Sequence, residues 1–139
     1  MCGIAGFCNW GSEWKKNIER MNECMIYRGP DASGVWSSDD QTVVLGHRRL
    51  AIVDLTETGA QPMLSNNDRY VISYNGEIYN CDLIKKKLLA EGKVVAFRGT
   101  SDTEVLLEAI SAYGLESTLR QIKGMFALAV YDRQEKELC

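Results

Sequence analysis

Residues 125–139 read MFALAVYDRQEKELC, which is an apolar run, a polar stretch and the beginning of a second apolar segment. The nearly continuous apolar run 125–131 is typical of a β-strand that is covered on both faces. The polar residues 132–136 predict a turn, and 137–139 look like the start of an antiparallel return strand. Natural domains rarely end one residue or so into such a strand, so we expect this chain to be a fragment of a longer one.

The segments upstream of this hairpin predict further strands and helices. Asn75-Gly76 suits a positive φ and is expected to end a strand over 70–74. Ser101-Asp102-Thr103-Glu104 has the pattern of a capping box at the start of a helix. Strands are predicted over 3–8, 35–36, 42–45, 50–55, 70–74 and 94–97, and helices over 13–25, 80–91, 102–113 and 115–122. Strands in hairpin order, with helices in two groups, indicate an α+β domain built on antiparallel sheets.

The composition excludes several classes of protein. The 139 residues suit one domain, and 45% hydrophobic with 25% charged residues excludes a wholly disordered or collagen-like chain. A net charge of −3 argues against nucleic-acid binding. The sequence has no apolar run of membrane-spanning length and no secretory signal, so a cytoplasmic protein is expected. Five irregularly spaced cysteines and a single histidine argue against a disulfide framework and against a metal site.

Cys2 is the first candidate for chemistry. A cysteine taken at random is more often a small buried hydrophobic residue. If Met1 is removed, however, Cys2 carries a thiol and a free α-amine, and an amine with a pKa of about 7.7–8.0 suits a general base. Such a thiol is an activated nucleophile that needs no histidine. Retention of Met1 would instead turn the amine into an amide.

Polar residues elsewhere could complete a site around this nucleophile. Arg49 could hold a carboxylate through two parallel hydrogen bonds, although a solvated basic pair with Arg48 is the simpler interpretation. Asn75-Gly76 could be a plain turn, or could offer a side-chain amide and a main-chain N–H as an oxyanion hole. Asp102 could bind a ligand, cap a helix, or do both. His47 is expected to be a structural hydrogen-bonding residue rather than a catalyst.

Taken in order, these residues resemble the glutamine amidotransferase domain (class II, N-terminal-nucleophile) of the asparagine synthetase family. Related sugar-phosphate and phosphoribosyl amidotransferases resemble the chain around Cys2 and 101–104, but they differ after Gly46-His47, where RRLAIVDL favours the asparagine synthetase type. The resemblance covers residues 2 to about 131, and its motifs are Cys2-Gly3-Ile4, Arg28-Gly29-Pro30-Asp31 with Gly34, residues 46–55 (GHRRLAIVDL), Gln61-Pro62-Met63, residues 75–80 (NGEIYN), residues 101–104 (SDTE) and Gly124-Met125-Phe126-Ala127.

The resemblance implies both a fold and a set of roles. The fold is a four-layer αββα domain over residues 2–139, with two stacked antiparallel sheets between helical layers and an incomplete C-terminus. Cys2 would be the nucleophile, and the Asn75 side chain and Gly76 N–H would form the oxyanion hole. The residues expected to bind free glutamine are Arg49 at its α-carboxylate, Asp102 with Glu77 at its α-ammonium group, and Ile52 and Val53 through backbone groups.

The implied activity is hydrolysis of free glutamine to glutamate and ammonia through a Cys2 thioester. In the family the ammonia passes to a C-terminal synthetase domain that uses ATP and magnesium, most often to make asparagine from aspartate. These 139 residues contain no Ser-Gly-Gly-type pyrophosphate loop, so no cofactor or metal is expected within them. The expected partners are L-glutamine and that synthetase domain, with a homodimer left open and with neither nucleic acid nor membrane. Two alternatives remain: a non-catalytic or regulatory module of the same fold, and an amidotransferase that serves another carboxylate or a sugar.

Overall fold

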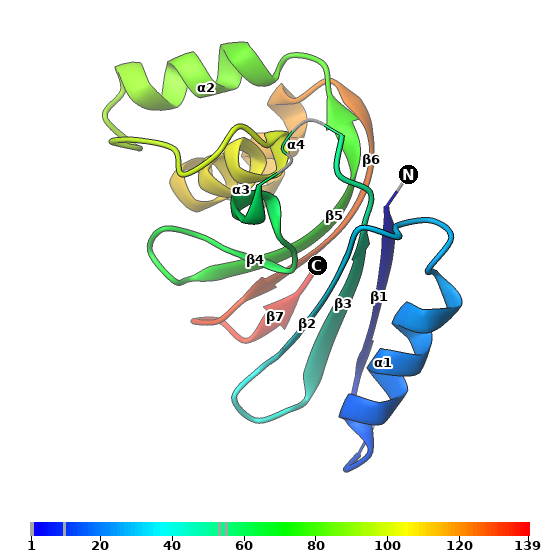
Figure 1. Cartoon of the computed structure of the whole chain (residues 1–139). Coiled ribbons are helices and arrows are strands. Elements are labelled where there is room, and N and C mark those ends of the chain that lie inside the picture. The colour runs from blue at the N-terminus through cyan, green and yellow to red at the C-terminus, as the bar shows by residue number, and fades with distance from the viewer. Residues whose placement is uncertain (1, 10, 53, 55) are drawn as a thin grey trace.

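Two antiparallel β-sheets lie face to face in the computed structural model, which describes residues 2–9, 11–52, 54 and 56–139 (Figure 1). The first sheet has the strand order β1-β3-β2 and the second has the order β4-β5-β6-β7. The elements in chain order are β1 (Gly3–Cys8), α1 (Trp14–Cys24), β2 (Ala32–Ser37), β3 (Val43–Arg49), the 3-10 turn η1 (Glu57–Gly59), β4 (Met63–Leu64), β5 (Tyr70–Ile78), α2 (Cys81–Ala90), α3 (Asp102–Tyr113), α4 (Leu115–Gln121), β6 (Gly124–Asp132) and β7 (Glu137–Leu138).

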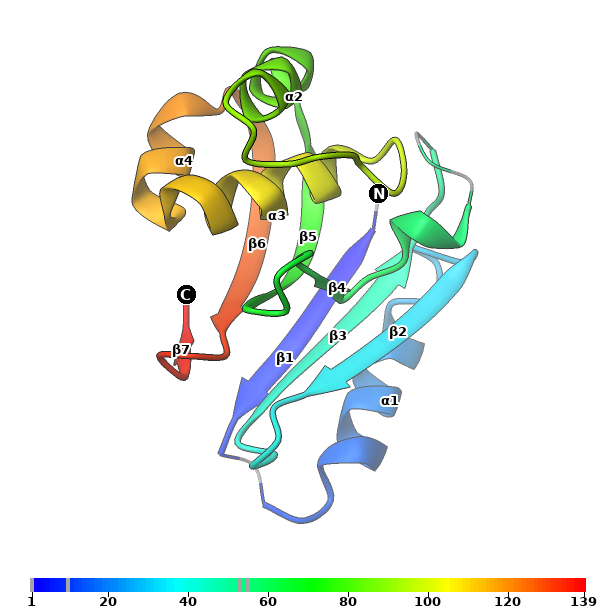
Figure 2. The same cartoon turned by 90° about the vertical axis from the view of Figure 1, so that its left-hand side faces the viewer.

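A helical layer covers the outer face of each sheet. α1 lies against β1 and β3, and its Ile18 is fully buried in that contact. α3 packs on β5, and α2 and α4 pack in turn on α3 (Figures 1 and 2). The order helix, sheet, sheet, helix confirms the predicted four-layer αββα fold and the α+β class.

The larger apolar core lies between the second sheet and α3. It contains Ile72 and Tyr74 of β5, Leu106 and Ile110 of α3, and Leu88 of α2, and none of these side chains is more than 2% exposed. Full burial of an aliphatic side chain stabilises a fold by about 1.5–3 kcal/mol. These contacts therefore fix α3 firmly on β5.

Polar contacts help to join the two sheets. Ser73 Oγ donates to Gly46 O at 3.1 Å, and His47 Nε2 lies 3.0 Å from Tyr74 O. Because a carbonyl only accepts, the His47 ring donates from Nε2. His47 is fully buried, which confirms the structural role expected for it. These contacts hold the second half of β3 against the middle of β5.

Three of the predicted strand assignments are wrong. β5 does not stop before Asn75 but continues to Ile78, because β6 pairs with it as far as Gly124. The described residues of the segment 50–55 form no strand, since Ala51 N donates to the Asp31 carboxylate at 2.8 Å instead of to a neighbouring strand. Residues 94–97 form a loop rather than a strand.

β6 is well covered only toward its end. Val130 and Tyr131 are buried, whereas Met125 is 70% exposed and Phe126 is 38% exposed. The prediction of a strand covered on both faces is therefore wrong for the first half of the run 125–131. The return strand is confirmed, because β7 pairs antiparallel with Tyr131 and Asp132.

Candidate active site

The start of β1, the ends of β3 and β5, and the start of α3 lie at the same end of the molecule (Figures 1 and 2). β1 and β3 pair Gly3 with Arg48, so the next step of this register sets Cys2 beside Arg49. Paired residues of antiparallel strands share one face of the sheet. A Cβ on Gly3 would point at Met25, on the α1 side. Cys2 and Arg49 therefore lie on the opposite face, toward the second sheet.

The half-buried Cys2 side chain contacts the main chain just after β3. Leu50 N donates to Cys2 Sγ at 3.3 Å, and Leu50 O lies 3.6 Å from the same sulfur as an acceptor for the thiol. Arg28 Nε donates to Cys2 O at 3.1 Å. Both the side chain and the backbone of Cys2 are thus held in place.

The Arg28-Gly29-Pro30-Asp31 segment supports this arrangement in a way that the sequence did not reveal. Asp31 N donates to Arg49 O at 3.0 Å, and Asp31 Oδ2 accepts from Ala51 N at 2.8 Å. The segment therefore fixes the main chain on both sides of the residue that Cys2 contacts. Local reasoning identifies it only as a break in regular structure, and its place in the family motif was the one available signal.

The guanidinium of Arg49 is held by the loop that follows β3. Nη1 donates to Thr56 O at 2.7 Å, and Nη2 donates to Asp54 O. A guanidinium has five N–H donors, so these two contacts leave others for a carboxylate ligand. Arg49 is thus a positioned side chain rather than a freely solvated one.

The Asp54 carboxylate ties that loop together. Oδ1 accepts from Thr56 N at 2.8 Å and from Thr56 Oγ1 at 2.6 Å, and Oδ2 accepts from Thr58 Oγ1 at 3.1 Å and from Thr100 N at 2.9 Å. These hydrogen bonds, led by that of the Thr56 hydroxyl, hold the pKa of Asp54 well below its usual range. Asp54 is therefore a buried anion that joins two loops.

The main-chain N–H of Gly76 points away from β6. Val130 exchanges two hydrogen bonds with Cys139 on the far side of β6. Main-chain groups alternate between the two edges of a strand. In the observed register, Tyr74, Gly76 and Ile78 therefore direct their N–H groups to the edge of β5 opposite β6.

The amides on either side of Gly76 along this edge have partners. Tyr74 N donates to Gln61 Oε1 at 2.6 Å, and Ile78 N donates to Asp102 Oδ2 at 3.2 Å. The Gly76 N–H lies between them, and Gly76 itself is exposed. Such a donor, on a strand that β6 holds at its other edge, could serve in an oxyanion hole.

Asn75 and Glu77 face the first sheet. Tyr74 and Ile78 lie in the core with α3, and the alternation of a strand turns Asn75 and Glu77 to the opposite side. Neither side chain makes a hydrogen bond to any residue that the structure describes. Asn75 is half-buried and Glu77 is exposed, so both are available to a ligand.

Asp102 begins α3 but does not cap it. Ser101 is the N-cap, and its Oγ accepts from Glu104 N at 3.3 Å. Asp102 Oδ2 instead accepts from Tyr74 OH at 2.9 Å and from the Ile78 amide. Burial first, and the Asp102 carboxylate second, raise the pKa of Tyr74 above its usual range. Asp102 is thereby fixed at the end of β5.

The remaining predicted residues are Ile52 and Val53, and of these only Ile52 can be placed, in the loop after β3. Ile52 is 71% exposed, and Val53 lies outside the described residues. Cys2 and Arg49 therefore lie at one end of the first sheet, with Ile52 in the loop that follows, and the segment 75–77 and Asp102 lie at the corresponding end of the second sheet.

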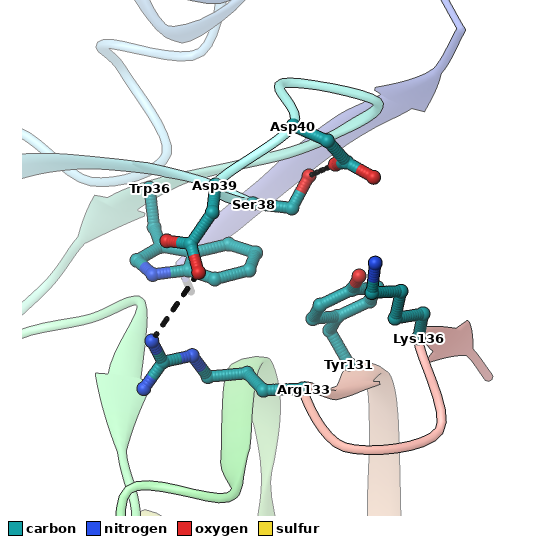
Figure 3. A pocket seen from close by; sticks show the side chains of 7 residues that line it. All are labelled: Trp36, Ser38, Asp39, Asp40, Tyr131, Arg133 and Lys136. Carbon is teal, nitrogen blue, oxygen red and sulfur yellow. Dashed lines mark hydrogen bonds and ion pairs between the residues drawn. The ribbon is translucent and has the colours of Figure 1, made fainter.

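Two hollows in the surface lie elsewhere. One of about 550 Å³ runs beside α3, along residues 66–67 and 93–96. The other, of about 100 Å³, lies between the β2–β3 turn and the β6–β7 turn, where Arg133 approaches Asp39 at 3.8 Å (Figure 3). Neither is lined by a predicted site residue. The convergence of strand ends, rather than a hollow, identifies the site.

The described part of the chain contains no group of three or more His, Cys, Asp or Glu side chains that could hold a metal ion. Across the same residues, no helix is both long and apolar enough to cross a membrane.

Known proteins match the chain over nearly its whole length. A family model described as "Glutamine amidotransferase domain" matches residues 1–139. Glutamine-hydrolyzing asparagine synthetase 3 of Bacillus subtilis (strain 168) is 41% identical over 143 residues, with 99% of this chain and 22% of the relative covered. Glutamine-hydrolyzing asparagine synthetase B of Escherichia coli (strain K12) is 36% identical over 138 residues, with 97% and 24% covered. The chain thus spans about a quarter of the length of these curated relatives.

Other relatives carry other names. Amidase chry2 of Gibberella zeae is 33% identical over 150 residues, with 99% of this chain and 22% of the relative covered. Among solved structures, the glutamine phosphoribosylpyrophosphate amidotransferase from B. subtilis, complexed with ADP and GMP, superimposes with a TM-score of 0.70 at 21% identity and covers 95% of this chain and 35% of its own. That likeness confirms the N-terminal-nucleophile amidotransferase fold. With a family model over the full chain and relatives above 30% identity, the chain belongs to the glutamine amidotransferase family, in the branch that contains glutamine-hydrolysing asparagine synthetases.

Proposed function

We propose that this chain hydrolyses the side-chain amide of free glutamine and that the ammonia serves the synthesis of asparagine from aspartate in a synthetase domain. The observation that carries the proposal is the meeting of two sheet ends. Cys2 directly precedes β1 and contacts Leu50, the residue after Arg49, at one end of the first sheet, and the Gly76 amide and Asp102 lie at the corresponding end of the second. The names of the curated relatives support asparagine as the product.

The reaction that we propose begins with Cys2. Its Sγ attacks the carboxamide carbon of glutamine, and the Cys2 α-amine, which is free once Met1 is removed, takes the thiol proton. The Asn75 side chain and the Gly76 N–H stabilise the oxyanion, each by roughly 3–4 kcal/mol on the scale of comparable sites. The α-ammonium then returns the proton to the leaving nitrogen, and ammonia departs. Water hydrolyses the remaining thioester to glutamate and restores the thiol.

The other site residues bind the substrate as a free amino acid. Arg49 holds the α-carboxylate with the guanidinium N–H groups that its loop does not use. Asp102, with Glu77 nearby, holds the α-ammonium group, and Ile52 with Val53 lines the pocket through backbone groups. Recognition of both charged groups favours free glutamine over glutamine within a peptide.

The use of ammonia belongs to residues beyond this chain. We propose that ATP, with magnesium, activates the aspartate carboxylate in a separate synthetase domain. A homodimer is compatible with the proposal and is not needed for the chemistry.

Product analysis on the full-length protein tests the proposal. Glutamine should give glutamate and ammonia, and Cys2→Ala should abolish the reaction. Asn75→Ala should lower kcat by about a hundredfold or more. Addition of aspartate and ATP should give asparagine. Glutamine hydrolysis without asparagine would indicate another acceptor, and no hydrolysis by protein that lacks Met1 would indicate a non-catalytic module.

A further inference from the structure

Asp54 stands between two loops that meet at the candidate site. Its Oδ1 binds Thr56 of its own loop, and its Oδ2 binds Thr100 N of the loop before α3 as well as the Thr58 hydroxyl. The side chain is 6% exposed, so these donors replace most of its water. A carboxylate with four protein donors fixes the main chain around it.

The main chain that Asp54 fixes is the one that holds Arg49. The two carbonyls that accept from the Arg49 guanidinium are those of Asp54 and Thr56. Thr56 also gives both its N–H and its hydroxyl to Asp54 Oδ1. The Asp54 carboxylate and the Arg49 guanidinium are thus joined through one short turn, although they share no direct hydrogen bond.

Two glycines make the approach of these segments feasible. A Cβ on Gly99 would lie 2.6 Å from Asp54 Oδ2. A Cβ on Gly59 would overlap the Arg49 guanidinium itself. Any other residue at either position would push apart the groups that Asp54 brings together.

The loop before α3 is anchored in turn by Glu104. Its carboxylate is 1% exposed and accepts from Arg98 N at 2.8 Å and from Gly99 N at 2.9 Å. Thr100 N, which follows directly, is the donor to Asp54. Arg49 on the first sheet is therefore coupled to the start of α3, where Asp102 lies.

We propose that Asp54 is a positioning residue that orients the Arg49 guanidinium and thereby sets the preference for a substrate with an α-carboxylate. Asp54 does not touch the substrate in this proposal, because its four hydrogen bonds are to the two loops. The inference rests on the proposed function for its consequence in catalysis, but the orientation of Arg49 can be measured separately.

Asp54→Asn is the first test variant, and Asp40→Asn is its matched control. Asp40 Oδ1 accepts from the Ser38 hydroxyl at 2.6 Å (Figure 3). Asp40 Oδ1 also accepts from Thr42 Oγ1 at 2.8 Å and from Thr42 N at 3.2 Å, so Asp40 has a similar network. It lies in the turn before β3, whereas Arg49 ends β3, so about 20 Å of strand separates the two. Both variants remove one charge and keep the side-chain volume.

We expect Asp54→Asn in the full-length protein to raise the KM for glutamine by about tenfold, with a much smaller change in kcat, because a charge-assisted contact is misaligned. The preference for glutamine over γ-aminobutyramide, which lacks the α-carboxylate, should fall by a similar factor. Asp40→Asn should change neither quantity. In an Arg49→Lys background, Asp54→Asn should add little, because two residues that act through one contact are not additive. Equal effects of the two Asn variants, or full additivity with Arg49→Lys, would overturn the proposal.

The orientation of Arg49 provides a readout that does not depend on turnover. In protein with isotope-labelled arginine, the Nη signals of Arg49, assigned by their loss in Arg49→Lys, should be resolved because two carbonyls restrain the group. They should merge in Asp54→Asn and stay resolved in Asp40→Asn. Unchanged signals in Asp54→Asn would refute the inference even in an active glutaminase. If the signals merge in Asp54→Asn but the unsubstituted protein has no glutaminase activity, the positioning of Arg49 by Asp54 is supported and the proposed function is refuted.

Gly99→Ala is the second variant, in case Asp54→Asn fails to fold. It displaces the 98–100 loop from Asp54 while every charge is kept. It should raise the KM for glutamine and lower the preference over γ-aminobutyramide in the same direction. A folded Gly99→Ala protein with an unchanged preference would also contradict the proposal.

Discussion

At the scale of single residues, His47 shows how burial fixes a charge state. Its Nε2 donates to Tyr74 O, and its Nδ1 is buried without a hydrogen-bond partner among the described residues. Burial lowers the pKa of His47 to about 4, because an imidazolium there would lose water without gaining an anion. The ring is therefore neutral near pH 7 and acts only as a bridge between the sheets.

We expect His47 to make the folded state sensitive to mild acid. Between the ordinary pKa of 6.5 and the folded value of about 4, the unfolded chain binds a proton that the folded chain does not. The contribution of the neutral His47 ring to the free energy of unfolding is fully present above pH 6.5. It is lost as the pH falls toward 4, and the total loss is about 3 kcal/mol. His47→Gln, which keeps a donor for Tyr74 O, should flatten this part of the pH dependence of the free energy of unfolding, measured by urea denaturation. Equal pH dependence in the two proteins would contradict a buried neutral ring.

Gly76 is a second residue whose role follows from its surroundings. A Cβ on it would lie 2.5 Å from Phe126 Cβ and 2.7 Å from Phe126 Cα. Gly76→Ala should therefore separate β5 from β6 locally and cost about 1–3 kcal/mol of stability. It should also displace the amide proposed for the oxyanion hole and lower kcat more than it raises KM, which steady-state kinetics would measure. A folded variant with unchanged kcat would exclude Gly76 from the oxyanion hole.

At the scale of elements, features that depend on neighbours in sequence were predictable. The cap of α3 is one, because Ser101 and the Glu104 amide are three residues apart and need no distant partner. The end of β5 was not predictable in this way, because Asn75-Gly76 is kept extended by pairing with Ala127 and Phe126, which come much later in the chain. Likewise, residues 94–97 look like a strand locally but form a loop in the fold.

The start of α3 allows capping and ligand binding to be separated. Ser101→Ala removes the cap and should cost about 1 kcal/mol of unfolding free energy without changing the KM for glutamine. Asp102→Asn keeps the cap, so its stability should change little while the KM rises by about tenfold or more. Thermal unfolding and steady-state kinetics on both variants would check this. A KM effect in Ser101→Ala alone would reverse the two assignments.

At the scale of the whole molecule, the stacking of the sheets decides which residues meet. The Trp36 and Tyr131 rings, 5.3 Å apart, and the contact of Ser73 with Gly46 join residues that are distant in sequence. No periodicity reports such stacking, so the four layers were predictable only through the family resemblance. The candidate site could be named from motifs, but its grouping depends on strand register. The contacts of Asp54 are not predictable from the sequence, because one of them joins it to Thr100, which is far away along the chain.

The most direct measurement is the intact mass of the full-length protein before and after exposure to a diazo-ketone analogue of glutamine, followed by peptide mapping. If Cys2 is the nucleophile of a glutamine site, Met1 is absent and one saturable adduct forms on Cys2. Glutamine should block this adduct, and Cys2→Ala should lack it, while the exposed thiols of Cys8 and Cys24 stay unmodified. Protein that lacks Met1 and either forms no adduct or reacts equally at Cys8 and Cys24 would contradict a nucleophile at Cys2.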